Sequence, residues 1–113
     1  MTQKSKKYLS DILMAIELIE EFTLDYKDFN LYDQDRKTQS AVERQLAIIG
    51  EALNQFKKLE PKIIIKNDKQ IISFRNRLVH AYDSLDNSMI WVIINRHLNP
   101  LKIEIQNLMT ATL

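Results

Sequence analysis

A single glycine, Gly50, in a chain of 113 residues is the feature that most constrains the fold. Folds made only of β-strands need many tight turns, and those turns need residues that accept positive φ. One glycine and two prolines cannot supply them. Long helices joined by a few polar loops need far fewer such residues, so we expect an all-α fold.

Apolar residues recur three and four positions apart along most of the chain, which is the period of an amphipathic helix. This pattern predicts four helices, over residues 5–23, 36–59, 69–82 and 87–98. Residues 25–35 lose the pattern and predict a loop with one short helical turn. Pro61 should end the second helix, because proline cannot continue the hydrogen-bond ladder. The isoleucine run 63–65 would suit a strand, but a lone strand has no partner, so we expect an extended linker packed on the helices.

The carboxyl-terminal part of the sequence contains Pro100, which predicts a break or kink and then a last helical segment over residues 101–109. Short connections favour antiparallel neighbours. The sequence therefore predicts an up-and-down four-helix bundle with an extra C-terminal helical segment. It contains no repeats and no low-complexity tract, so residues 1–113 are expected to form one domain.

Composition excludes several classes of function. The chain has no cysteine, so it has no disulfide, thiol nucleophile or thiolate metal site. Its apolar runs are too short to span a membrane, and no apolar signal-peptide core follows the charged amino terminus. We therefore expect a cytoplasmic protein with no membrane contact. With 16 basic and 15 acidic residues the net charge is +1, so any contact with nucleic acid must be local.

The candidate chemistry lies in the octad Arg75-Asn76-Arg77-Leu78-Val79-His80-Ala81-Tyr82. On an ideal helix Arg75 and Tyr82, seven residues apart, fall nearly in line, whereas Arg75 and His80 are about 140° apart. The length of an arginine side chain closes part of that gap. A second copy of the helix, packed against the first, could close the rest. The spacing alone therefore indicates a composite site built by two subunits.

Histidine exchanges a proton near neutral pH, and arginine presents a planar fork of donors to a phosphate. RNA, unlike DNA, carries its own nucleophile, the ribose 2′-hydroxyl. A base for its proton and a cation for the phosphorane would suffice for strand scission, with no metal and no cofactor. The competing interpretation is a solvated helix face with one satisfied histidine, because an arginine five residues before a histidine also occurs by chance.

The run Arg75-Asn76-x-Leu78-x-His80-x-Tyr82 resembles the signature of HEPN domains, specifically of their HepT-like branch. Two further segments agree with that branch: Ala41-Val42-Glu43-Arg44 followed by Ile48-Ile49-Gly50-Glu51-Ala52, and Trp91-x-Ile93-Ile94. The resemblance covers nearly the whole chain. The arginine–histidine motif alone is modestly specific, and the three segments together are strongly so.

The resemblance implies a helical homodimer in which Arg75 and His80 of both subunits line one site that cuts RNA. It also implies a toxin paired with an MNT-type nucleotidyltransferase antitoxin. The motif tyrosine, here Tyr82, would be the acceptor for AMP transfer from that partner. An added nucleotide brings bulk and negative charge within two residues of His80, which would repel an incoming phosphate backbone.

Other residues are candidates for supporting roles. Gly50 should permit close helix approach. Glu51 could face the cleft and hydrogen-bond a motif residue, or be plainly exposed. Asn76 could orient His80 or cap a neighbouring backbone group. Arg77 could contact RNA phosphates or form a surface salt bridge. His97 is assigned a structural role at the end of the fourth helix, and Trp91 is assigned to the core.

Two rival functions remain open. One is a non-catalytic helical binding partner of a nucleotidyltransferase, or a module that holds a nucleotide. The other is a structural bundle with no ligand. Docking alone has no need for this spacing of arginine, histidine and tyrosine, so we expect a metal-independent endoribonuclease.

Overall fold

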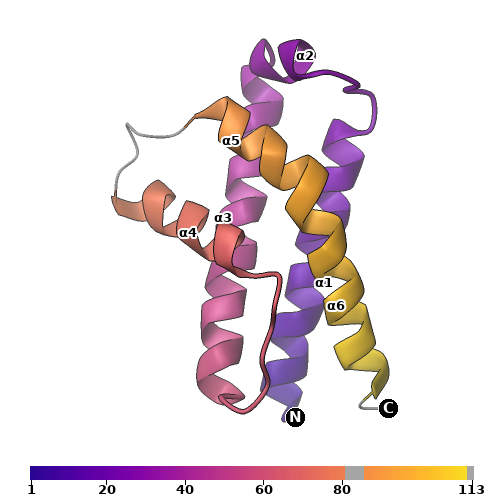
Figure 1. Cartoon of the computed structure of the whole chain (residues 1–113), viewed down its shortest axis with the longest axis vertical. Helices are drawn as coiled ribbons and strands as arrows, with labels where there is room; N and C mark the ends of the chain where they lie inside the picture. Colours follow the sequence, from indigo (N-terminus) through magenta and orange to yellow (C-terminus); the bar gives the residue numbers. More distant parts are fainter. Residues whose placement is uncertain (81–85, 112–113) are drawn as a thin grey trace.

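The computed structural model describes residues 1–80 and 86–111, without the side chains of Val79 and His80. Every regular element within these residues is helical, which confirms the expected all-α class. The order is α1 (Gln3–Thr23), α2 (Phe29–Asp33), α3 (Arg36–Leu59), α4 (Lys69–His80), α5 (Asn87–Val92), a π-helical turn η2 (Ile93–His97) and α6 (Leu98–Ala111). Figure 1 shows α4 tilted across α3 rather than alongside it. The predicted up-and-down arrangement of the four helices therefore stays a prediction.

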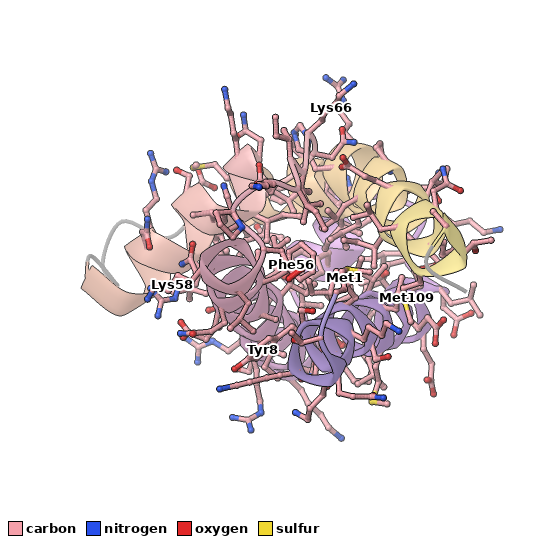
Figure 2. The ribbon with its side chains drawn as sticks, turned by 90° about the horizontal axis from the view of Figure 1, so that it is seen from below. Met1, Tyr8, Phe56, Lys58, Lys66 and Met109 are labelled. Carbon is pink, nitrogen blue, oxygen red and sulfur yellow. The ribbon has the colours of Figure 1, made fainter. Side chains whose placement is uncertain are left out.

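The core lies between the long helices α1 and α3, which run side by side in opposite directions, and α6, which packs against α1 (Figure 1). Figure 2 shows Phe56 of α3 in the interior, whereas Lys58 and Lys66 extend away from the protein. Apolar side chains of all these helices are buried at helical spacing, among them Leu9, Ile12, Ile16, Ile19, Val42, Leu46, Ile49, Leu53, Leu101 and Ile105. Their burial is the main favourable contribution to the stability of the fold.

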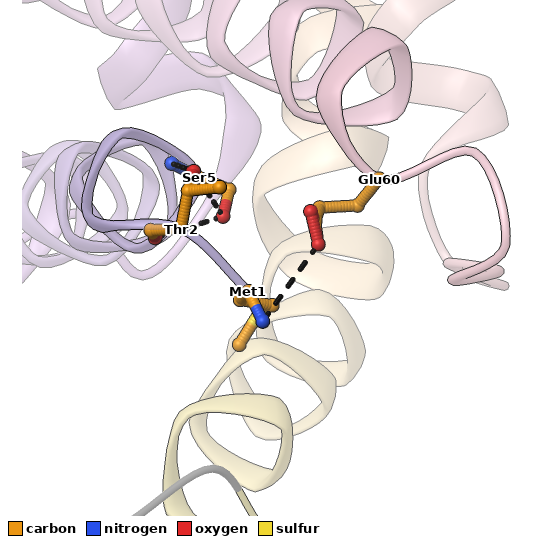
Figure 3. Close-up of polar contacts among 4 residues, drawn as sticks. All are labelled: Met1, Thr2, Ser5 and Glu60. Carbon is orange, nitrogen blue, oxygen red and sulfur yellow. Dashed lines mark hydrogen bonds and ion pairs between the residues drawn. The ribbon is translucent and has the colours of Figure 1, made fainter.

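The first turn of α1 is capped locally, so the helix begins two residues before the predicted start (Figure 3). Thr2 Oγ1 accepts a hydrogen bond from the Ser5 backbone N–H at 3.1 Å, and Ser5 Oγ donates to the Thr2 carbonyl at 2.9 Å. The amino group of Met1 lies 3.9 Å from a carboxylate oxygen of Glu60, just after α3. This ion pair joins the beginning of α1 to the end of α3.

The loop between α1 and α3 contains the predicted short helical turn as α2. Asp28 caps α2 and Asp35 caps α3, each by accepting a backbone N–H three residues later. Asp35 also accepts a hydrogen bond from the Tyr26 hydroxyl, and this bond lowers the pKa of the Asp35 carboxyl. Gln39 Nε2 donates to the carbonyl of Tyr32 at 3.0 Å, which fastens α2 to the first turns of α3.

The segment that leads into α4 is an extended linker packed on the helices, as predicted. Ile65 is buried, whereas Ile64 is exposed. The backbone N–H groups of residues 66 and 67 both donate to Glu104 of α6, at 2.7 and 3.0 Å. Asp68 is buried and its carboxylate lies 2.8 Å from Lys57 Nζ on α3. These contacts fix where α4 begins.

Of the break or kink predicted at Pro100, the break is wrong, because α5, the π turn and α6 are continuous along residues 87–111. The kink stays a prediction. The Leu98 N–H donates to the Ile93 carbonyl, five residues earlier, so one turn is wider than an α-helical turn. This wide turn comes directly before Pro100, whose missing N–H and ring disfavour a regular α-helical bond to residue 96. The helix therefore accommodates the proline within its length.

The carboxyl-terminal helix also settles two assignments. Trp91 is partly buried against the core and lies 5.6 Å from the Tyr32 ring, between ring centroids, which confirms its assignment to packing. His97 does not lie at a helix end as predicted, because α6 continues the helix. The structural role at a helix end that was assigned to His97 therefore does not apply.

Candidate active site

Gly50 of α3 lies directly against the side chain of Arg75 on α4. A Cβ atom at position 50 would lie 2.4 Å from Arg75 Cβ and 2.7 Å from Arg75 Cγ. Contacts of Cβ atoms under 3.0 Å are essentially never seen, so only glycine allows α4 to approach α3 this closely. The expected role of Gly50 in close helix packing is confirmed. The side chain that it admits is the predicted catalytic arginine.

Glu51, the next residue of α3, binds the guanidinium of the same arginine. Arg75 Nη2 donates to Glu51 Oε2 at 2.5 Å, and the other carboxylate oxygen accepts from Gln55 Nε2 at 2.9 Å. Arg75 Nη1 also donates to Asn76 Oδ1 at 3.4 Å. Of the two interpretations of Glu51, hydrogen bonding to a motif residue is the one that the structure shows.

The ion pair between Arg75 and Glu51 is partly solvated: the Arg75 side chain is 25% exposed and that of Glu51 is 47% exposed. Pairs in such surroundings contribute at most about 1 kcal/mol to stability. The pair instead fixes where the guanidinium points. A single carboxylate oxygen engages one of the five guanidinium donors, which leaves others for a phosphate.

An open groove of about 730 Å³ lies beside this ion pair. Its walls come from α1, α3 and α4, and they mix apolar side chains with both signs of charge. The lining residues are Tyr8, Asp11, Ser40, Glu43, Arg44, Ala47, Ile48, Glu51, Ala52, Arg75 and Leu78. Burial raises the pKa of the Glu43 carboxyl. Arg75 thus stands where a surface groove meets α4, accessible to a ligand.

Arg77 lies on a different face of α4, about 200° around the helix from Arg75. Its side chain is exposed, and Nη1 lies 3.0 Å from the sulfur of Met89. Among the residues that the structure describes, Arg77 forms no ion pair. The surface salt bridge considered for Arg77 is therefore absent there, and its contact with RNA stays a prediction.

The other half of the motif is placed only in part. Position 80 is the last residue of α4, but the His80 side chain lies outside the described part of the chain, as does all of Tyr82. Asn76 is exposed, and its Oδ1 accepts a hydrogen bond from Arg75. The roles predicted for His80 and Tyr82, and the orienting of His80 by Asn76, stay predictions.

Three residues that contribute to the site, Gln55, Tyr8 and Asp11, were not predicted from sequence. Gln55 is four residues after Glu51, so the helical spacing could have identified it as a neighbour of that carboxylate. Tyr8 and Asp11 line the groove from α1. Nothing in their local sequence marks them, because their position depends on how α1 packs against α3.

The described residues, 1–80 and 86–111, contain no cluster of three His, Cys, Asp or Glu side chains placed to hold a metal ion. None of the described helices is both long enough and apolar enough to cross a membrane. The site can therefore bind and stabilise negative charge. It presents a guanidinium with further N–H donors, which a carboxylate fixes at the side of an open groove.

Comparison with known proteins identifies the class to which this fold and site belong. The sequence model of the family described as "Ribonuclease HepT-like" matches residues 12–108. The chain therefore belongs to the HepT-like family of the HEPN superfamily. This confirms the resemblance drawn from the motif and its two flanking segments.

Individual relatives agree with the family. The chain is 42% identical over 108 residues to "Probable ribonuclease HepT" of Thermococcus cleftensis, covering 90% of this chain and 93% of the relative. It is 32% identical over 105 residues to "Putative RNase MJ1380" of Methanocaldococcus jannaschii, covering 89% and 93% of the two chains. It also matches "Gamma-glutamylcyclotransferase and putative RNase MJ0434" of the same organism, at 33% identity over 96% of this chain and 49% of that one. No solved structure matches the chain.

Proposed function

We propose that this chain is an endoribonuclease that cuts RNA without a metal ion. The observation that carries the proposal is the guanidinium of Arg75, seated over Gly50 and held by Glu51 at the side of an open groove. Membership of the ribonuclease HepT-like family and the names of two relatives as ribonucleases support it. The whole chain, residues 1–113, would act as one HEPN-like domain.

The reaction that we propose is attack of a ribose 2′-oxygen on the adjacent phosphorus. The P–O5′ bond breaks, which leaves a 2′,3′-cyclic phosphate on one fragment and a 5′-hydroxyl on the other. His80 takes the 2′-hydroxyl proton and a proton is returned to the leaving 5′-oxygen. Arg75 neutralises the charge that grows on the phosphorane. The nucleophile and the leaving group are both supplied by RNA, so the chemistry needs no metal.

Glu51 has two effects in this scheme. It fixes the guanidinium before RNA arrives, so less side-chain freedom is lost on binding. It also competes with the phosphate for the Nη2 donor, so RNA must share or displace one hydrogen bond. Gln55 holds the other carboxylate oxygen and keeps Glu51 in place. We propose Glu51 and Gln55 as positioning residues for Arg75, with Asn76 in contact with the same guanidinium.

A second copy of the chain completes the site in this proposal. Arg75 and position 80 lie about 140° apart around α4, so one helix cannot readily direct both side chains at one phosphate. Two α4 helices facing each other would bring Arg75 of one protomer to His80 of its partner. Light scattering of the purified protein should therefore give the mass of a dimer.

The direct test is cleavage of single-stranded RNA in the presence of a chelator. The wild-type protein should produce fragments with 2′,3′-cyclic phosphate ends, detected by mass spectrometry. Arg75→Ala and His80→Ala should each abolish both this cleavage and the arrest of cell growth. If both variants cut RNA and arrest growth like the wild type, the proposed active site is wrong. A folded wild-type protein that leaves RNA intact would favour a non-catalytic partner of a nucleotidyltransferase instead.

We further propose that the chain is the toxin of a pair, active in the cytoplasm and silenced by AMP transfer to Tyr82. The proposed donor enzyme is an MNT-type nucleotidyltransferase antitoxin. Tyr82 is two residues beyond His80, so an added nucleotide would place a negative charge beside the site. Intact-mass measurement after incubation with ATP and the transferase should show one AMP adduct. A Tyr82→Phe variant that still gained the adduct would exclude this acceptor.

A further inference from the structure

A smaller pocket, of about 200 Å³, lies between α4 and the segment formed by α5 and the π turn. Its lining is mainly apolar and includes Phe74 from α4, Met89 from α5 and Ile93 from the π turn. None of these side chains takes part in the Arg75–Glu51 pair. The pocket is therefore a separate feature of the surface around α4.

Four polar side chains also line this pocket: the Gln70 amide, the Ser73 hydroxyl, the Arg77 guanidinium and the His97 imidazole. Arg77 is exposed, whereas His97 is half-buried. An amide offers both donors and an acceptor, and an imidazole can do the same. Apolar walls combined with a few such polar groups are typical of sites that bind small molecules.

The π turn contributes directly to the pocket. Ile93 and His97, the first and last residues of this turn, both line it. π-Helical turns of this kind are rare in proteins, and those that do occur are often found at functional sites. Here the wide turn carries the one described histidine side chain that faces a pocket shared with α4.

The register of α4 connects this pocket to the proposed chemistry. Ser73 and Arg77 both line the pocket and lie four residues apart on one face of the helix. Position 80 follows Arg77 by three residues, so its backbone lies one turn further along the same face. A strand of RNA that follows this face passes first the pocket, then Arg77, and then position 80.

We propose that this pocket holds one unpaired base of the RNA substrate, with Arg77 on the adjoining phosphate; the inference rests on the proposed function. Sequence-selective proteins read single-stranded RNA by enclosing splayed-out bases and hydrogen-bonding their edges. The apolar walls suit the faces of a base, and Gln70 and His97 suit its polar edge. The volume is below the range of about 300–1,000 Å³ usual for complete small-molecule ligands, so it suits a base without its sugar.

Cleavage kinetics with Gln70→Ala and His97→Ala provide the first test, with Arg96→Ala as the matched control. Arg96 is the exposed neighbour of His97 and does not line the pocket. Each pocket variant should raise KM for single-stranded RNA about tenfold, equivalent to about 1.4 kcal/mol, with little change in kcat. Base preference at one position near the cut should weaken. The control should match the wild type. Unchanged KM and unchanged preference in both pocket variants would overturn the proposal.

The second test does not depend on cleavage. Isotope-labelled Arg75→Ala protein is titrated with each of the four ribonucleoside 5′-monophosphates and followed by NMR. The resonances of Gln70 and His97 should shift, more strongly for one base than for the others. If these shifts occur but the wild type cuts no RNA, the proposed function fails and the pocket stands. If RNA is cut but neither KM nor the resonances respond, the pocket proposal fails and the function stands.

Discussion

Arg75 and Arg77 are two residues apart on one helix, yet they have very different surroundings. Arg75 packs over Gly50 and is bound by Glu51, so α3 fixes both its stem and its charged end. Arg77 is exposed, and its guanidinium lies against the sulfur of Met89. The same residue type thus has two different settings: a cation held by a carboxylate on one face of α4, and an exposed cation with no ion pair to any described residue on the other.

Replacement of each arginine by lysine should separate these roles most strongly. Lysine keeps the charge but loses the planar fork that engages a carboxylate and a phosphate together. Arg75→Lys should lower kcat for RNA cleavage by about 10²–10³-fold, the range seen when one oxyanion-stabilising donor is removed. Arg77→Lys should change KM only a few-fold. Equal losses in kcat for the two variants would contradict the distinction.

Gly50→Ala tests the contact that admits Arg75. An added methyl group in a packed contact costs about 1–3 kcal/mol. Better helix propensity returns up to about 1 kcal/mol of that. We expect a net loss of about 1–2 kcal/mol in the free energy of unfolding, measured by urea denaturation. Ser10→Ala, at an exposed position of α1, should change it by less than about 0.5 kcal/mol. A Gly50→Ala protein that is more stable than wild type would disprove the close contact.

Lys57→Met tests whether an ion pair anchors the beginning of α4, as the Arg75–Glu51 pair anchors its middle. The variant leaves the buried Asp68 carboxylate without its ion-pair partner. The expected loss is about 1 kcal/mol, because Lys57 is itself partly exposed and water can replace some of the interaction. Lys58→Met, at the exposed neighbouring position, is the control and should leave unfolding unchanged. Equal stabilities of the two variants would show that this ion pair does not anchor α4.

Glu43→Gln should give the smallest of these changes in the free energy of unfolding. Burial raises the folded-state pKa of Glu43, so its ionised form costs stability once the pH exceeds that raised value. The variant should therefore be slightly more stable than wild type at neutral pH. The difference should shrink as the pH falls through the folded-state pKa and vanish below the unfolded-state value. Denaturation curves at several pH values would measure it, and a difference that grows on acidification would have the wrong sign.

The sequence predicted the helices well where local signals are strong. The predicted range of the second helix coincides with α3, and the predicted start at residue 69 coincides with that of α4. The break considered at Pro100 does not occur, because a proline also fits inside a helix when the preceding turn widens. That π turn depends on tertiary packing, which periodicity does not report.

Prediction of the site likewise succeeded where local sequence signals are strong and failed where tertiary packing decides. Arg75, Glu51 and Gly50 were all identified from sequence, and the structure brings these three together. The groove wall from α1 and the pocket under Arg77 were not predicted, because both arise where helices distant in sequence meet. Local spacing identifies residues that share a helix face, whereas the partner helix decides what that face contacts.

A mixed dimer tests the central proposal, a composite site, most directly. One subunit carries Arg75→Ala and the other His80→Ala, and differently tagged copies are co-expressed so that the heterodimer can be purified. Each homodimeric variant should be inactive, whereas the heterodimer retains one intact pairing of Arg75 with His80 across the interface. We predict that the heterodimer recovers a substantial part of the wild-type rate of RNA cleavage. A heterodimer as inactive as its parents would contradict a site shared in this way.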